Sequence, residues 1–136
     1  MRLLARREHS RAELAARLAA AGGAPGDIEA LLDGLEAKNW LSDRRYAASY
    51  VADKRGRYGR LKLSHELHRR GVAANIIDEV LAATQESEAA RLKEVWARKF
   101  GIFPKDAREY ARQSRFLLGR GFAAEAVRRL LGAGQE

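Results

Sequence analysis

LLGRGFAAEAVRRLL at residues 117–131 aligns without a gap with LHRRGVAANIIDEVL at 67–81 and with LAAAGGAPGDIEALL at 18–32. In every copy a glycine follows the first leucine by four residues, and aliphatic residues recur six, nine and ten residues after that glycine. The three glycines, Gly22, Gly71 and Gly121, are 49 and then 50 residues apart. A fixed period of this length is typical of repeat proteins, whose units pack against their neighbours. The sequence therefore predicts a tandem array.

Helical patterns extend along the whole chain. Ser10 to Glu13 has the form of a capping box, in which the serine oxygen accepts from the Glu13 backbone amide. Pro25-Gly26-Asp27 predicts a turn and an N-cap before a helix that stops near Asn39. Further helices are expected from Ser42 or Asp43 to the Gly56–Gly59 region and over about 60–70, 74–84, 87–100, 105–119 and 123–131, while no useful length alternates with the period of a strand.

The expected fold class is all-α, with tandem three-helix repeats that form an elongated, curved array. We assign the repeats to residues 1–39, 40–84 and 85–136. The leading helix of the first repeat is short or truncated, which exposes Leu3 and Leu4 unless they pack on the second repeat. Trp40 and Trp96 are expected to fill the junctions between repeats, because large rings bury much area. We expect a monomer.

The composition of the 136 residues limits the class of protein. No cysteine is present, so the chain has no disulfide or thiolate chemistry, and a reducing, cytoplasmic compartment fits best. No apolar run is long enough to span a bilayer, and the first residues lack the pattern of a signal peptide. We therefore expect no association with a membrane.

No sequence motif indicates catalysis. There is no phosphate-binding glycine loop, and no serine has an obvious histidine and acid to activate it. His65 and His68 lie three residues apart on a predicted helix, but a metal ion would need further ligands that the sequence does not supply. We expect no enzyme activity, no catalytic residue, no cofactor and no metal ion.

The net charge of +8 is distributed unevenly along the chain. Residues 1–40 carry six basic and six acidic side chains, whereas 41–77 carry nine basic and three acidic ones. Residues 78–97 carry two basic and five acidic side chains, and 98–136 carry nine and four. Such clusters of positive charge attract nucleic acid or an acidic protein surface.

Two cationic segments are candidate contact surfaces. The first, Lys54 to Lys62, surrounds two glycines and a tyrosine, and its arginine forks match carboxylates and phosphates. The second lies on one face of a predicted helix and just after it. Either segment could instead be a solvated polar face, and Tyr58 could stack on a base or close a helix end against its own core. The candidate residues for contact with a partner or DNA are Lys54, Arg55, Arg57, Tyr58, Arg60, Lys62, Arg69, Arg70, Arg108, Arg112, Arg115 and Arg120.

Three segments together resemble one known family. LLARREHSRAEL at residues 3–14, WLSDRRYA at 40–47 and RFLLGRGF at 115–122 closely resemble RecX, the bacterial regulator of the RecA recombinase. The resemblance implies an all-helical protein of three-helix repeats. It also implies binding to RecA filaments on single-stranded DNA and, in most members, restraint of their ATPase, strand exchange and coprotease activities. The chain departs from the family pattern at Arg60, where a proline is frequent, and in the longer turn at 23–26.

An alternative function is that of a sequence-nonspecific binder of single- or double-stranded DNA. The sequence leaves open which basic residues would contact RecA and which would contact DNA. It also leaves open whether a regulator of this kind caps filament growth, promotes disassembly or stabilises an inactive filament.

Overall fold

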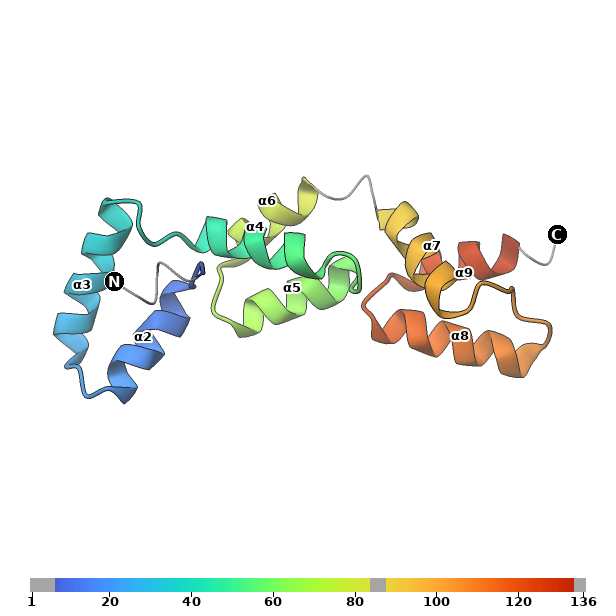
Figure 1. Cartoon of the computed structure of the whole chain (residues 1–136), viewed down its shortest axis with the longest axis horizontal. Coiled ribbons are helices and arrows are strands. Elements are labelled where there is room, and N and C mark those ends of the chain that lie inside the picture. Colours follow the sequence, from blue (N-terminus) through green and yellow to red (C-terminus); the bar gives the residue numbers. More distant parts are fainter. Residues whose placement is uncertain (1–6, 84–87, 134–136) are drawn as a thin grey trace. The chain divides into compact units, whose positions relative to one another are not determined.

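The computed structural model describes residues 7–83 and 88–133. Within these ranges the chain forms eight α-helices and no strand (Figure 1). The all-α prediction is confirmed, and each predicted helix is found within a few residues of its expected bounds. Leu3 and Leu4, which belong to the predicted short leading helix, lie outside the described residues. The helices are α2 (Arg11–Ala20), α3 (Pro25–Ala37), α4 (Asp43–Lys54), α5 (Arg60–Arg69), α6 (Ala74–Ala82), α7 (Glu88–Lys99), α8 (Ala107–Gly119) and α9 (Ala124–Ala133).

The helices belong to two compact units. The N-terminal unit comprises Met1–Ala52 and Glu66–Val80, and the C-terminal unit comprises Asp53–His65 and Leu81–Glu136. Because this division passes through α4, α5 and α6, the units do not coincide with the three repeats assigned from the sequence. The repeat boundaries at 39/40 and 84/85 therefore stay a prediction. Among the described residues, no helix is both long enough and apolar enough to cross a bilayer.

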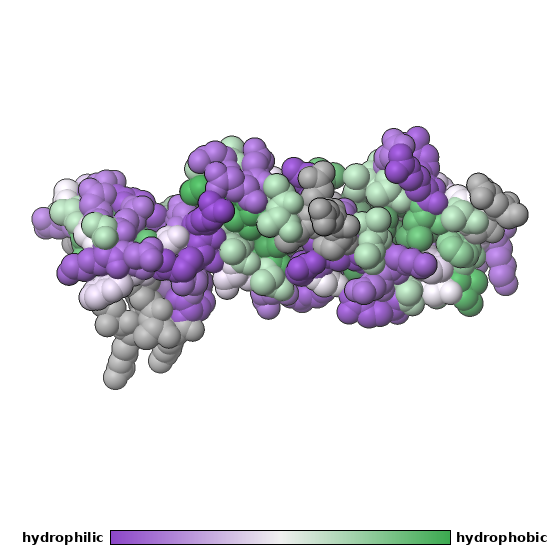
Figure 2. Space-filling model, turned by 90° about the horizontal axis from the view of Figure 1, so that it is seen from above, coloured by the Kyte–Doolittle hydropathy of each residue, from purple (hydrophilic) through white to green (hydrophobic). Residues whose placement is uncertain are grey.

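Each unit has a core built from the repeated aliphatic positions. Leu67 and Leu117, which begin two of the aligned stretches, are fully buried, whereas Leu31 of the first stretch is 43% exposed. The core of the N-terminal unit contains Leu14, Ile28, Leu32, Leu35 and Leu41. The core of the C-terminal unit contains Leu92, Val95, Trp96, Leu117, Phe122, Val127 and Leu131. On the face shown in Figure 2, hydrophobic residues also lie between hydrophilic ones, as is normal for protein surfaces.

The prediction for the start of α3 is wrong, while that for α2 is confirmed. The Ser10 side chain accepts a hydrogen bond from the backbone amide of Glu13 at 3.0 Å and so caps α2. In α3, however, Pro25 is itself the first helical residue and Ala24 is the N-cap, so that Asp27 lies in the first turn. Proline fits this position because its backbone angle suits the helix and the first amide has no partner within the helix.

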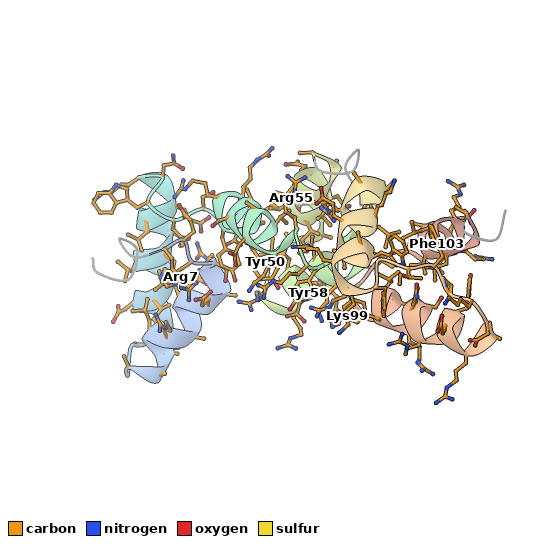
Figure 3. All side chains as sticks on the ribbon, turned by 45° about the vertical axis from the view of Figure 1, so that its right-hand side comes forward. Arg7, Tyr50, Arg55, Tyr58, Lys99 and Phe103 are labelled. Carbon is orange, nitrogen blue, oxygen red and sulfur yellow. The ribbon has the colours of Figure 1, made fainter. Side chains whose placement is uncertain are left out.

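The two tryptophans do not fill junctions as expected. Trp40 is 55% exposed, with the Lys38 ammonium 5.2 Å from its ring centre. Asn39 has a φ of 61° at the end of α3, and the turn that follows buries Leu41 in place of the tryptophan. Trp96 is buried, but it lies in the core of the C-terminal unit, where it stacks on Phe103, labelled in Figure 3, at 4.5 Å.

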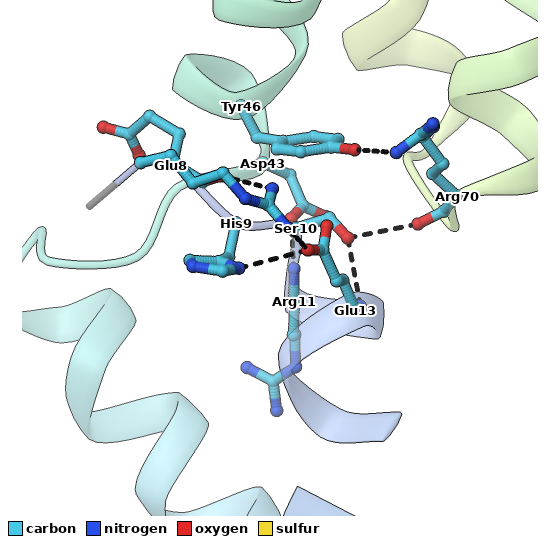
Figure 4. Close-up of polar contacts among 9 residues, drawn as sticks. Glu8, His9, Ser10, Arg11, Glu13, Asp43, Tyr46 and Arg70 are labelled. Carbon is cyan, nitrogen blue, oxygen red and sulfur yellow. Dashed lines mark hydrogen bonds and ion pairs between the residues drawn. The ribbon is translucent and has the colours of Figure 1, made fainter. Parts of the chain in front are cut away.

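A close joint in the N-terminal unit connects the end of α5 to the start of α2. The Ser10 hydroxyl donates to the carbonyl oxygen of Arg70 at 3.2 Å (Figure 4). Gly71 has a φ of 85°, and a Cβ there would lie 2.4 Å from the Cβ of Ala12. The backbone amide of Arg11, the first residue of α2, donates to the Asp43 carboxylate at 2.7 Å. At this helix end the Arg11 amide is thus satisfied from another helix and the Glu13 amide by the Ser10 cap.

The C-terminal unit contains an equivalent joint between the end of α8 and the start of α5. The amides of Gly59 and Leu61 donate to the carbonyls of Arg120 and Gly121 at 2.7 and 3.0 Å. The Arg60 amide donates to Glu88, the first residue of α7, at 3.0 Å, just as Arg11 donates to the first residue of α4. The repeated sequence therefore produces a repeated joint, in which the C-terminal turn of one helix covers the N-terminal turn of another.

Candidate functional site

The cations of the N-terminal unit are largely neutralised by nearby acids. The Arg11 guanidinium pairs with Glu29 and Asp33, at 2.9 Å each, and also with Glu36. Arg45 pairs with Glu8 at 2.9 Å. Arg44 pairs with Glu79. These side chains connect neighbouring elements and leave little net positive charge on this unit.

A network around the start of α2 includes further paired groups (Figure 4). Burial alone would raise the pKa of Glu13, but hydrogen bonds with Arg7 and His9 and the positive charge of Arg7 outweigh it, so the pKa is lowered. Arg70 donates to the Tyr46 hydroxyl at 3.0 Å, and this hydrogen bond raises the pKa of Arg70 against the opposing effect of burial. Arg70 also lies over the ring of Tyr50 at 5.0 Å. Arg70 is thus part of the folded network.

In the C-terminal unit, by contrast, three cations surround the ring of Tyr58. The Lys62 ammonium lies 4.5 Å from the ring centre, and the guanidinium carbons of Arg57 and Arg120 lie 5.7 and 5.8 Å away. The Tyr58 carbonyl accepts from Arg91, which is only 6% exposed and also pairs with Glu88. Burial lowers the pKa of Arg91; the Glu88 carboxylate opposes this shift, and the positive charge of Arg55 adds to it. Arg91 is therefore a buried side chain that binds the backbone at Tyr58 by a hydrogen bond.

Two phenylalanines continue this arrangement. Arg120 lies 5.0 Å from the ring centre of Phe116, and the Lys99 ammonium lies 5.1 Å from the same ring. Phe116 meets Phe100 edge to face at 5.5 Å, and Arg112 lies 5.3 Å from the Phe100 ring. Tyr58 and Lys99 are labelled in Figure 3. We define the cation–aromatic band as Arg57, Tyr58, Lys62, Lys99, Phe100, Arg112, Phe116 and Arg120.

The cations of this band have no acidic partners within the part of the chain that the structure describes. None of its five basic side chains has a carboxylate oxygen within 4 Å there, unlike Arg11, Arg44 and Arg45. An aromatic face orders a cation by attraction to its ring but does not cancel its charge. The band is therefore a set of ordered positive charges that remain available to an anionic ligand.

A hollow of about 220 Å³ lies beside the band. Its lining includes the apolar side chains of Val95 and Phe116, here called its floor, and the cations Arg57, Arg98, Lys99 and Arg120, here called its rim. The Arg98 guanidinium donates to the carbonyl of Gly56, which also lines the hollow. A second hollow of about 330 Å³ shares Lys99 and is also lined by Phe100, Lys105 and Arg112. The first hollow thus offers apolar surface bordered by cations, whereas the acidic Glu109 also lines the second.

The structure brings together only part of the predicted site. Arg57, Tyr58, Lys62, Arg112 and Arg120 belong to the cation–aromatic band. Arg108 and Arg115 are exposed on α8. Arg69 and Arg70 belong to the other compact unit, where Arg69 lies 3.9 Å from Glu66 and Arg70 contacts Tyr46.

The remaining predicted cations lie outside the band. Lys54 lies 3.5 Å from the Asp53 carboxylate. Arg55 is partly buried, within electrostatic range of Arg91. Arg60 lines a different hollow, of about 650 Å³, together with Leu61, Ala89, Ala123 and Ala126. A continuous run of basic residues in the sequence is therefore divided between different surroundings.

Sequence reasoning missed Arg98, Lys99, Phe100 and Phe116. Two cations directly precede an aromatic residue at the end of α7, which is a weak local signal. The two histidines singled out earlier, His65 and His68, are exposed on α5. Within the described ranges, no group of three or more histidine, cysteine or acidic side chains could hold a metal ion.

Comparison with known families gives two matches. Residues 42–81 match the model of the second three-helix domain of RecX, and residues 86–131 match the model of its third three-helix domain. The two models together cover more than half of the chain. The segment that matches the third three-helix domain, residues 86–131, contains those residues of the cation–aromatic band that lie on α7 and α8.

Comparison with individual proteins gives a consistent result. The chain is 47% identical over 131 residues to the regulatory protein RecX of Leptothrix cholodnii, which covers 96% of this chain and 83% of the relative. It is 46% identical to the regulatory protein RecX of Ralstonia nicotianae over 94% of this chain and 80% of that relative. The crystal structure of RecX from Lactobacillus salivarius superposes with a TM-score of 0.81 at 18% identity, over 98% of this chain and 90% of that one. This last similarity concerns the fold.

Proposed function

The chain belongs to the RecX family, and we propose that it is a regulatory protein that binds RecA nucleoprotein filaments. In this role it restrains RecA ATPase, strand exchange and coprotease activity in homologous recombination and the SOS response. It acts in the cytoplasm as a monomer, without a cofactor and without enzyme activity of its own. The observation that carries the proposal is the similarity to regulatory RecX proteins over nearly the whole chain.

We place the filament contact on the cation–aromatic band. Its cations are ordered by aromatic rings and have no carboxylate partner in the described part of the chain. Complementary charge raises the rate of encounter and orients the partners. An acidic surface of a filament, or the phosphates that the filament carries, would supply the missing negative charge.

Addition of the protein to RecA on single-stranded DNA should lower the DNA-dependent ATPase. We expect the effect at less than one molecule per RecA protomer, because one bound regulator should restrain several protomers of the same filament. The measurement is a titration of the protein into a steady-state ATPase assay, with RecA without DNA as the control. Unchanged ATPase and strand exchange at equimolar protein would contradict the proposal.

The cations of the band, which have no carboxylate partner among the described residues, also favour a second candidate function, nonspecific binding of DNA. Binding through phosphates alone should weaken steeply with salt, with a slope of log affinity against log salt of about −3.5 for five contacts on a single strand. Binding to a RecA filament should retain a larger salt-resistant part, because protein contacts contribute. Parallel titrations on bare DNA and on filaments distinguish the two functions. Identical salt slopes would favour the general DNA binder.

A further inference from the structure

We propose that the hollow beside the cation–aromatic band is a nucleotide subsite for single-stranded nucleic acid. One base lies against the floor of Val95 and Phe116, and the adjoining phosphates contact Arg57, Lys99 and Arg120. This inference deepens the proposed function. It rests on that function in one respect, which is that a RecA filament carries single-stranded DNA. It assigns a specific chemical ligand to residues that the family comparison leaves unassigned.

The rim of the hollow is suited to phosphate. Four cations, Arg57, Arg98, Lys99 and Arg120, border one space of about 220 Å³. Three of them are ordered by rings: Arg57 and Arg120 lie over Tyr58, and Lys99 and Arg120 lie over Phe116. Because guanidinium groups have rigid forks of donors, they match phosphate oxygens in two-point contacts. Charges already held in position lose less freedom when the ligand binds.

The floor of the hollow is suited to a base. Val95 is buried and Phe116 partly buried, and both are apolar side chains that line the hollow of about 220 Å³. Bases of single strands stack on aromatic side chains and on arginine planes without regard to sequence. The Arg120 guanidinium, which lies 5.0 Å from the Phe116 ring centre, adds such a plane beside the floor.

The combination predicts a preference for single strands. In a duplex the bases are paired and stacked on one another, so a base would have to be extruded before it could enter the hollow. An acidic protein segment could meet the cations, but it would not use the floor in the same way. A ligand with both phosphates and an unstacked base can contact the cations of the rim and the apolar floor at the same time.

The test uses the full chain and three fluorescent probes of equal length at equal salt: an oligothymidine strand, the same strand with abasic sites, and a duplex. We expect the oligothymidine strand to bind about tenfold more tightly than the abasic strand, as one stacked base allows. Phe116→Leu should abolish this difference while binding of the abasic strand persists, and Phe116→Tyr should restore it. Circular dichroism confirms that each variant is folded.

Arg57→Gln combined with Lys99→Gln tests the rim without altering the core. Removal of two phosphate contacts should reduce the salt slope for single strands by about 1.4. Lys93→Gln combined with Arg128→Gln removes the same charge from exposed positions outside the hollow and should leave the slope nearly unchanged. Equal binding of the oligothymidine, abasic and duplex probes, or equal slopes for the two double variants, would overturn the subsite. If the wild type then still restrains RecA ATPase, the proposed function stands without it.

Discussion

Alanine at Gly121 should destabilise the protein far more than alanine at Gly22, although the two glycines occupy equivalent positions in the repeat. Both have left-handed backbones, with φ of 92° and 94°. A Cβ at Gly22 would meet no atom within 4 Å, whereas a Cβ at Gly121 would lie 2.3 Å from the Cβ of Lys62 and 2.4 Å from its backbone nitrogen. The difference in stability between these two variants therefore measures the contribution of close packing at the joint between the end of α8 and the start of α5.

The expected sizes follow from two separate effects. A side chain at a left-handed position lowers the free energy of unfolding by about 1 kcal/mol, which is all that we expect for Gly22→Ala. Overpacking adds about 2 kcal/mol, so Gly121→Ala should lose about 3 kcal/mol. Gly59→Ala should show the steric part alone, because its Cβ would lie 2.6 Å from the backbone of Gly121. The joint would have to open, and with it the hydrogen bond from the Gly59 amide to Arg120.

Urea unfolding followed by circular dichroism measures all three variants. The Gly22→Ala protein is the matched control, because it carries the same substitution with the same backbone angle. Equal unfolding midpoints for Gly22→Ala and Gly121→Ala would mean that the α8 end does not pack on the α5 start in solution. The repeated joint would then be wrong.

Reversal of three charges in the cation–aromatic band should nearly abolish binding to a RecA filament. We expect Arg57→Glu, Lys99→Glu and Arg120→Glu together to weaken binding by more than 100-fold, or about 3 kcal/mol, since attraction is replaced by repulsion. The fold should survive. Each cation–ring contact at a site of this exposure is worth only about 0.5–1 kcal/mol, and the Arg120 carbonyl used in the joint is retained.

The matched control is Lys93→Glu, Arg128→Glu and Arg129→Glu. These residues belong to the same unit, are exposed, and produce the same change in net charge when reversed. Filament binding is measured by co-sedimentation with RecA on single-stranded DNA at several salt concentrations. If both triple variants lose affinity equally, only the overall charge matters and the band is an ordinary solvated surface.

The sequence by itself determined the local structure of this protein. The Ser10 cap, the left-handed glycines and the spacing of buried aliphatic residues each depend on interactions between residues close in sequence. The sequence pattern therefore predicts them directly. The same applies to fold class, because helical periodicity without strand alternation excludes a sheet protein. The start of α3 was mistaken only because proline can end a turn or open a helix.

Only the tertiary structure decided which cations are available to a partner. Arg11 and Arg57 are equally basic in the sequence, but Arg11 is neutralised by acids 18 to 25 residues away on α3, whereas Arg57 lies over Tyr58. Lys99 joins the band because Phe116 on α8 and Arg120, the residue that caps this helix, connect it to Tyr58. Charge is a property of a residue, but its neutralisation depends on neighbours that folding brings from distant segments. For that reason the predicted run from Lys54 to Lys62 was divided: Arg57, Tyr58 and Lys62 belong to the band, which Lys99 of α7 joins, while Lys54, Arg55 and Arg60 lie outside it.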